Sequence, residues 1–327
     1  MSLVSYLLLD LGTLALFAIT FWHAWKRGSS AVAELLTAAL YGLLLEYGMI
    51  LTHKTYSYSS GFWLALGPVP ITIGLCWGMI IYGAMLYTDQ LGLPRWAAPF
   101  ADSLVAILLD LAFDAIAIRL QLWTWTIPLS AGYFGVPADN FFAWLFVTLS
   151  FSAFTRWVRQ KQQRKRRGIQ VAAPLAAFVG LVLSIELFGL VADIVYPAGM
   201  PTGGGLPIFG ATFLVFMGVV GLVLWRRKVR IHRGVDLVPT LVRWSMHGYF
   251  LGWAVLLTFV PVLRLPGMDF PPFLLAAAMV LFAIEALLLV PLLQPQHPLR
   301  RQVSVHPLPL FRDVLPKARV QNEQSNA

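Results

Sequence analysis

The feature that most constrains this chain is a succession of apolar stretches, each about as long as a bilayer is thick. A membrane-spanning helix needs roughly 20 mainly apolar residues, and the sequence contains nine such stretches. They cover residues 3–25, 32–52, 67–88, 97–118, 139–158, 172–196, 206–225, 238–263 and 271–293. The pattern predicts an all-α fold, a polytopic membrane helix bundle in which residues 1–293 form a single transmembrane domain.

The composition agrees with a membrane protein. Of the 327 residues, 58% are hydrophobic and 12% are charged, and the mean hydropathy is +0.73, whereas a soluble domain carries about 25% charged residues. We expect no cleavable signal peptide, because the first stretch lacks a basic leading segment, is too long and ends in Lys26 and Arg27. The single Cys76 excludes an intramolecular disulfide and a cysteine metal cluster.

Basic residues are distributed unevenly between alternate connections, and this predicts the orientation of the bundle. If the amino terminus faces outward, the outer segments hold only Lys54, Arg119 and Arg264, which leaves 21 of the 24 Lys and Arg residues on the inner side. Loops rich in Lys and Arg stay in the cytoplasm. We therefore expect the amino end outside and the carboxyl end in the cytoplasm, in a bacterial-type inner (plasma) membrane. The net charge of +9 reflects this topology rather than nucleic-acid binding.

Residues 294–327 differ from the rest of the chain. This segment is rich in proline, polar and basic, and such a composition cannot bury enough apolar surface to fold. It is predicted to be a disordered cytoplasmic tail.

The unusual side chains are acids inside the apolar stretches. An Asp or Glu costs about 2.5–3.5 kcal/mol at the centre of a spanning helix, so it normally faces the protein interior and serves function. Converting position into depth at about 1.5 Å per residue places five acids in the outer half of the bilayer. They are Glu46, Asp110, Asp114, Glu186 and Asp193.

Asp110 and Asp114 stand one helical turn apart and so share a helix face. Burial and mutual repulsion oppose ionisation of both, so one of them is expected to hold a proton beside a carboxylate. Such a pair can act as an acid and a base. The alternative is that these acids only hydrogen-bond helices together, and this alternative carries more weight for Glu186 and Asp193. Glu285 and His247 lie in the inner half, and we expect them to be structural.

Aromatic motifs beside these acids carry a family resemblance. The motifs are EYG at Glu46, YSY at 56–58, GPVPITIGLCW at 67–77, DLAFDAIAI from Asp110, WTW at 123–125 and YFGVPADNFFAW at 133–144. In order and spacing, residues 40–150 resemble the integral-membrane carotenoid 1,2-hydratases, of the bisanhydrobacterioruberin and γ-carotene 1′-hydratase type. The chain departs from the family pattern at Ala115, where the family favours Pro, and at Ala143, where it favours Gly.

The resemblance implies an enzyme that adds water to the terminal C1=C2 double bond of an acyclic, lipophilic carotenoid, with no cofactor and no metal. Protonation at C2 creates a tertiary cation at C1, which aromatic faces and a carboxylate stabilise, and a base orients the attacking water. Our hypothesis makes Asp110 or Asp114 the proton donor, with the other aspartate and Glu46 as base and charge stabiliser. The candidate substrate-binding residues are Trp123, Trp125, Tyr133, Tyr58, Trp77, Asn140 and Trp144, and the secondary candidates are His53, Glu186 and Asp193.

Three other functions fit parts of the pattern. An acid-catalysed carotenoid cyclase uses the same protonation, but an alkene captures the cation. An intramembrane prenyltransferase chelates Mg²⁺ with aspartates from two helices, but Ala106 stands where such enzymes carry Asn or Asp, and no second Asp-rich motif is present. A proton-coupled transporter uses intramembrane acids as a relay, but its usual inverted repeat is not apparent.

Overall fold

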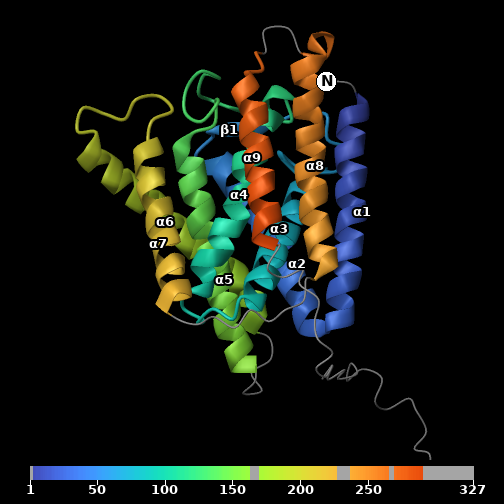
Figure 1. Cartoon of the computed structure of the whole chain (residues 1–327), viewed down its shortest axis with the longest axis vertical. Helices are drawn as coiled ribbons and strands as arrows, with labels where there is room; N and C mark the ends of the chain where they lie inside the picture. The colour runs from blue at the N-terminus through green and yellow to red at the C-terminus, as the bar shows by residue number, and fades with distance from the viewer. Residues whose placement is uncertain (1–2, 163–168, 227–235, 265–268, 290–327) are drawn as a thin grey trace, which may run out of the picture.

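The computed structural model describes residues 3–162, 169–226, 236–264 and 269–289, and these residues form a helix bundle (Figure 1). The described part of the chain contains nine α-helices, joined by short loops and two 3₁₀ turns (Ile169–Ala172 and Pro261–Leu263). The helices are α1 (Leu3–Arg27), α2 (Ser29–Thr52), α3 (Ile71–Gln90), α4 (Ala98–Arg119), α5 (Ala138–Gln162), α6 (Ala173–Val195), α7 (Leu206–Arg226), α8 (Leu237–Phe259) and α9 (Pro272–Leu289). The predicted all-α polytopic bundle is confirmed. The predicted tail, 294–327, lies outside the described residues.

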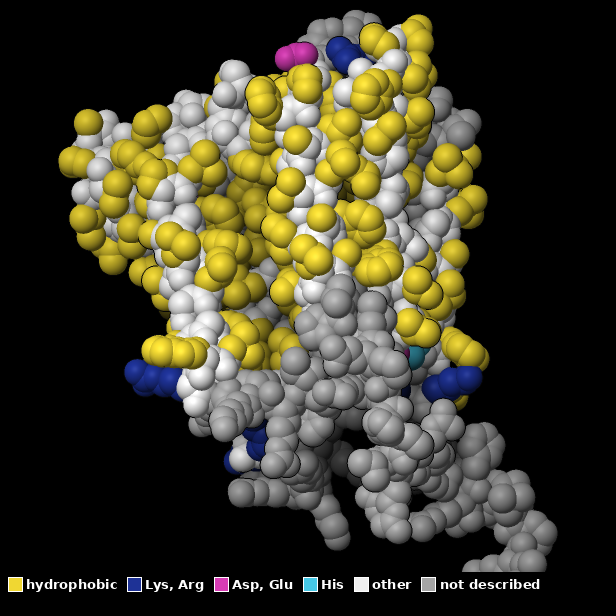
Figure 2. All heavy atoms as spheres, in the orientation of Figure 1, with side chains coloured by type: hydrophobic (Ala, Val, Ile, Leu, Met, Phe, Trp, Pro, Cys, Tyr) yellow, Lys and Arg dark blue, Asp and Glu magenta, His cyan; other side chains and the backbone are white. Residues whose placement is uncertain are grey.

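Six of the described helices are individually long and apolar enough to cross a membrane: α1, α2, α3, α5, α6 and α7. Helix α9 is a shorter apolar helix, and α4 carries three aspartates among its apolar residues. In Figure 2, hydrophobic side chains cover the middle of the visible face, whereas most of its Lys and Arg side chains lie toward the lower end. We call that lower end the inner end and the opposite end the outer end, after the predicted orientation.

Helix α4 is the central helix of the bundle. It packs against α3, α5, α7, α8 and α9, and 18 of its 22 residues are buried. Small residues along it, including Ala106, Ala112 and Ala115, allow neighbouring helices to approach closely, as is usual between membrane helices. The acids of α4 are therefore held in the interior of the protein rather than at its surface.

Helix α3 begins four residues later than predicted, at Ile71. Residues 65–70 instead form a tight hairpin, in which β2 (Ala65–Leu66) pairs with β3 (Val69–Pro70). Gly67 takes a positive φ of 59° in this turn, and Pro70 fixes the extended backbone that precedes the helix. Helix α8 likewise ends at Phe259 instead of residue 263, because Pro261 follows and cannot continue the helical hydrogen bonds.

Two short strands at the outer end were not predicted. Strand β1 (Tyr56–Tyr58) pairs antiparallel with β4 (Trp123–Trp125), in the register Tyr56 to Trp125 and Tyr58 to Trp123. We call this pair the aromatic ribbon. The ribbon ties the end of α2 to the end of α4. Because side chains alternate along a strand, its four aromatic side chains share one half-buried face, and Ser57 and Thr124 are exposed on the other.

The inner end is held together by buried and half-buried ion pairs. Arg156 of α5 contacts Asp89 and Asp102, and Arg159 contacts Asp89 and Glu34. These pairs join α2, α3, α4 and α5 in one network, which we call the inner cluster.

A second buried group lies between α8 and α9. There Arg243 pairs with Glu285 at 2.7 Å, and His247 Nε2 lies 2.8 Å from the same carboxylate. Each acid of both groups thus contacts a cationic side chain or a histidine, as expected for acids that stabilise a fold.

Candidate active site

Glu46, Asp110 and Asp114 all line one cavity near the outer end of the bundle, which we call the main cavity. Its volume is about 410 Å³. Its walls come from α1, α2, α3, α4, α5 and α8 together with the aromatic ribbon. The three acids are at most 8% exposed, and within the described residues none of them forms an ion pair with Lys, Arg or His.

Asp114 is held by three N–H donors. The indole Nε1 of Trp123 donates to its Oδ1 at 2.6 Å, and that of Trp125 donates to the same oxygen at 3.4 Å. The amide Nδ2 of Asn140 donates to its Oδ2 at 3.0 Å. Because charge-assisted hydrogen bonds are stronger than neutral ones, this environment favours the ionised form of Asp114.

Glu46 is also surrounded by neutral donors. Trp77 Nε1 donates to Oε1 at 2.8 Å, while the hydroxyl groups of Tyr56 and Tyr58 both donate to Oε2, the latter at 2.8 Å. Burial raises the pKa of Tyr56 and Tyr58 well above the usual range, and the nearby Glu46 raises each pKa further. Both phenols therefore stay protonated at physiological pH and remain donors.

Asp110 has fewer partners than the other two acids. Within the described residues, its only hydrogen-bond donor is the Asn140 amide, whose Nδ2 lies 3.0 Å from Asp110 Oδ2. The same nitrogen donates to Asp114, so Asn140 links the two aspartates across consecutive turns of α4. Among the described residues, Asp110 thus accepts a hydrogen bond from one donor, which it shares with Asp114. Asp114 and Glu46 each accept hydrogen bonds from three donors.

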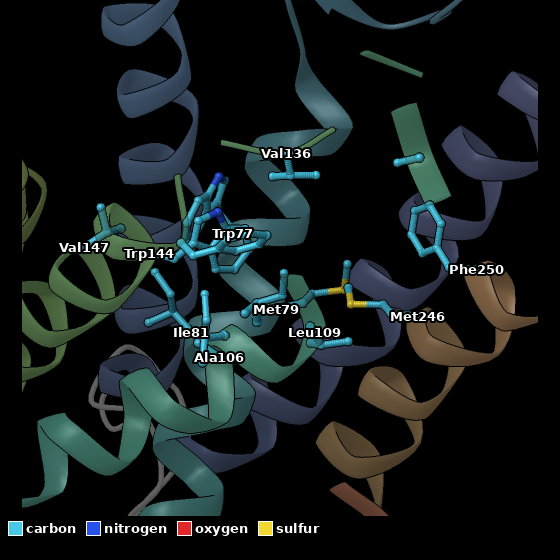
Figure 3. Packing of buried hydrophobic residues seen from close by; sticks show 14 of the residues in the cluster. Trp77, Met79, Ile81, Ala106, Leu109, Val136, Trp144, Val147, Met246 and Phe250 are labelled. Atoms are coloured by element: carbon cyan, nitrogen blue, oxygen red, sulfur yellow. The ribbon is translucent and has the colours of Figure 1, made fainter. Parts of the chain in front are cut away.

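Aromatic rings make up much of the cavity wall. The rings of Trp77 and Trp144 stack with centroids 4.1 Å apart, and Figure 3 shows these two side chains side by side, with Met246 and Phe250 of α8 farther across the packed interior. Phe113 of α4 stacks on Phe250 at 4.9 Å. Because aromatic faces are the negative pole of the ring quadrupole, such a wall can stabilise a cation that forms inside it.

The main cavity reaches the surface of the bundle at α1 and α8, and we take its opening to lie between these helices. Most of its lining residues are buried or half-buried, and the exposed ones are Leu8, Gly12 and Ala15 of α1 and Ser245 of α8. This opening lies among apolar surface along the side of the bundle, where hydrocarbon surrounds a membrane protein.

Several predicted site residues lie elsewhere. The Tyr133 hydroxyl donates to the backbone oxygen of Leu111 at 3.1 Å, and its ring packs on Phe134 and Phe141, away from the main cavity. His53 is exposed at the end of α2 and lines a smaller neighbouring cavity rather than the main one.

Glu186 and Asp193 are also not brought to the site, because both are exposed on α6. Helix α6 buries a stripe formed by Ala177, Leu181, Ser184, Phe188 and Ala192. These residues follow the helical repeat, and Glu186 lies on the opposite side of the helix from them. The two acids face away from the bundle interior, whatever their depth in the bilayer.

Other site residues were missed in the sequence. Tyr56 belongs to the YSY motif but was not a candidate, although the alternation in that motif places it on the same strand face as Tyr58. Phe113 lies between the two aspartates and lines the main cavity. Helix α8 contributes Met246, Tyr249 and Phe250 to the wall, and no motif in the sequence indicated that role.

The described residues contain no group of three or more His, Cys, Asp or Glu side chains arranged to hold a metal ion. The polar residues that line the main cavity carry carboxyl groups, phenols, indoles and one amide, together with the hydroxyl groups of Thr13, Thr72 and Ser245 and the Cys76 thiol.

Comparison with known proteins gives a family match over about the first two-thirds of the chain. The model of a family described as carotenoid biosynthesis protein matches residues 3–206, which is more than half of the chain. The match includes the three acids, the aromatic ribbon and Asn140, and it ends before α8. Neither the curated proteins nor the solved structures give a significant match to this chain.

Proposed function

The chain belongs to the carotenoid biosynthesis protein family, and on that premise we propose that it is a carotenoid hydratase, a hydro-lyase. In this proposal it adds water to the terminal C1=C2 double bond of an acyclic carotenoid end group and leaves a tertiary alcohol at C1. The observation that carries the proposal is a pair of carboxyl groups that contact no cationic side chain among the described residues and that line an apolar, aromatic-walled cavity reaching the side of the bundle.

The main cavity suits one end of a long polyene. Its volume of about 410 Å³ accommodates the end group and part of the chain, while the rest extends through the opening between α1 and α8 into the bilayer. Ligand sites of this kind are mostly apolar, with a few polar groups that fix orientation. Here those polar groups are the three acids and Asn140.

Asp110 is the proton donor in this mechanism. A carboxylate is stabilised by the hydrogen bonds that it accepts, and Asp110 accepts one where its neighbour Asp114 accepts three. When one proton is shared between two adjacent acids, it belongs on the acid with fewer donors. The proton passes from Asp110 to C2 of the alkene, and the two electrons of the π bond form the new C–H bond.

The tertiary cation that remains at C1 is stabilised by the surrounding charge and rings. Asp114 is ionised and held in place by three donors, so it provides a fixed negative charge that needs no reorganisation during the reaction. The faces of Trp123, Trp125 and Trp144, which line the main cavity, contribute cation–π attraction.

Glu46 is the base that completes the addition. Water attacks C1 through its oxygen, and Glu46 accepts the proton that the water loses as the C–O bond forms. One proton leaves Asp110 and one arrives at Glu46, so the reaction consumes only the alkene and one water. Proton exchange with water restores both acids before the next turnover.

Pigment analysis tests this proposal. The chain is expressed in a host that accumulates an acyclic carotenoid, and the pigments are compared with those of the empty host by chromatography and mass spectrometry. We expect a product heavier by one water for each reacted end, with ¹⁸O in the new hydroxyl group when cells grow in H₂¹⁸O. A product isomeric with the substrate would identify a cyclase instead, and an unchanged pigment profile in several such hosts would contradict both reactions.

A further inference from the structure

A second cavity adjoins the main cavity, and we call it the side pocket. Its volume is about 110 Å³, and its lining residues come from α2, α3, α5, α6, the aromatic ribbon and the segment between α2 and β1. The two cavities have six lining residues in common: Glu46, Tyr56, Trp77, Trp125, Asn140 and Trp144. Glu46 is the only carboxyl group of the proposed mechanism in this shared wall, because Asp110 and Asp114 line the main cavity alone.

The exposed residues that line the two cavities differ in chemistry. Those of the main cavity are Leu8, Gly12, Ala15 and Ser245, on the sides of α1 and α8. Those of the side pocket are His53, at the end of α2, and Asp139, in the first turn of α5. Both of these ionisable residues lie at the outer ends of their helices, where water meets the bilayer. The main cavity thus opens toward hydrocarbon and the side pocket toward water.

We propose that the side pocket binds the substrate water and delivers it to Glu46. This inference rests on the proposed function, since water is then the second substrate. A polyene that enters between α1 and α8 fills the opening of the main cavity, so water needs another way in. Attack from the side pocket would bring the water oxygen to C1 from the wall that holds Glu46, which accepts the proton as the C–O bond forms.

The side pocket meets the requirements for bound water. Its volume has room for several water molecules, and a buried water needs two to four polar partners. The Glu46 carboxylate, the Thr55 hydroxyl and the Ser184 hydroxyl line the pocket. The hydroxyl of Ser184 donates to the backbone oxygen of Leu181 at 2.6 Å, so its oxygen remains able to accept a hydrogen bond from water.

Two substitutions that fill the side pocket test this route. Ala143→Leu and Ser184→Leu add bulk to residues that line the side pocket but not the main cavity. We expect each to lower the yield of hydrated carotenoid at least tenfold, while the amount of carotenoid that co-purifies with the protein stays within twofold of wild type. Ser184→Ala is the matched control for bulk, because it removes the hydroxyl group without filling the space, and it should lower the yield less than Ser184→Leu does.

Ser245→Leu provides the opposite control. Ser245 lines the main cavity at its opening, so added bulk there should reduce the co-purified carotenoid. If the Ala143→Leu and Ser184→Leu variants both bind carotenoid and hydrate it with the wild-type yield, the proposed water route is wrong.

Hydroxyl-radical footprinting of the wild-type protein gives a test that needs no variant. Phe142 and Phe151 lie on the same helix and are 3% and 0% exposed, but only Phe142 lines the side pocket. Radicals generated from water in the pocket should oxidise Phe142 well above Phe151, and equal labelling would count against bound water there. The two proposals can fail separately. If the wild-type chain gives no hydrated product, the proposed reaction is wrong. If Phe142 is not labelled and the two pocket-filling variants are active, only the proposed water route is wrong.

Discussion

The bundle holds two groups of buried or half-buried acids at opposite ends, and the two groups differ in the side chains that neutralise them. Each acid of the inner cluster contacts a guanidinium group of Arg156 or Arg159. The acids of the main cavity instead accept hydrogen bonds from indoles, phenols and one amide, and they contact no cation among the described residues. Asp102 and Asp110, on the same helix and both at most 2% exposed, belong to different groups.

In the proposed mechanism, this difference separates structural acids from reactive ones. A buried carboxylate beside a guanidinium cannot take up or release a proton easily, because the ion pair would be broken and a charge left uncompensated. A carboxyl among neutral donors has no such partner, so its proton can move without leaving a buried cation behind. The inner cluster therefore holds helices together, and the outer acids are free to do chemistry.

The largest effect is expected from Asp110→Asn. The amide keeps the shape of the side chain but cannot donate the proton, and general acid catalysis contributes about 10²- to 10⁴-fold. Hydrated carotenoid per membrane-inserted protein should fall by at least about 100-fold, as measured by chromatography with mass detection. Asp114→Asn should also abolish the product, because it removes the charge that stabilises the cation. Normal yields from both variants would remove the pair from the mechanism.

Arg156→Met should affect stability rather than chemistry. The substitution leaves Asp102 buried without its guanidinium partner, and breaking a buried ion pair in this way costs about 3–5 kcal/mol. Unfolding in mixed micelles of increasing SDS content should show a lowered free energy of unfolding, with hydration per folded molecule close to wild type. A variant that is as stable as wild type but inactive would contradict the division between the two groups.

Trp123→Phe, which alters the surroundings of an acid of the main cavity, should have an intermediate effect on activity. The substitution keeps an aromatic ring but removes the N–H that lies 2.6 Å from Asp114 Oδ1. A hydrogen bond to a charged group contributes about 1.5–3 kcal/mol, so kcat should fall about 10- to 100-fold. Trp125→Phe is the matched control, since its N–H donates at 3.4 Å and its loss should have the smaller effect. A larger loss of kcat in Trp125→Phe than in Trp123→Phe would be inconsistent with this geometry.

Thr88→Val should have the smallest effect. The Thr88 hydroxyl donates to Asp102 in the inner cluster, where Arg156 continues to neutralise the carboxylate. The same hydroxyl accepts a hydrogen bond from Arg156. A hydrogen bond to a charged group contributes about 1.5–3 kcal/mol, and with the Arg156–Asp102 pair still in place we expect the low end of this range, which the same SDS titration can measure, while hydration should not change. A large loss of activity in this variant would show that the inner cluster communicates with the site.

The sequence predicted that Glu46, Asp110 and Asp114 lie together, but it could not predict which acids turn inward. Bilayer thickness sets helix length, so most predicted spans agree with the helices to within a few residues, and these three acids do line one cavity. Glu186 was placed at the same predicted depth, yet it is exposed on α6. Which face of a helix turns inward depends on packing against its neighbours, and the apolar sequence of α6, with a mean hydropathy of 2.3 over its most apolar window, does not mark one face as buried.

The cavity wall was harder to predict than its acids. The alternating YSY and WTW motifs contain a signal for strands, but strands of three residues are too short to stand out among long helices. Helix α8 is distant in sequence from every acid of the site, and its contribution of Met246 and Phe250 depends on how the bundle closes. Such long-range contacts have no local pattern in the chain.

The register of the aromatic ribbon has a consequence for how this protein can vary in length. Strand β1 supplies both phenol donors of Glu46, and β4 supplies both indole donors of Asp114. Insertion or deletion of a single residue in either strand would turn its side chains to the opposite face. One such change would deprive an acid of two donors at once, so natural relatives that keep the reaction should tolerate length changes beside these strands but not within them.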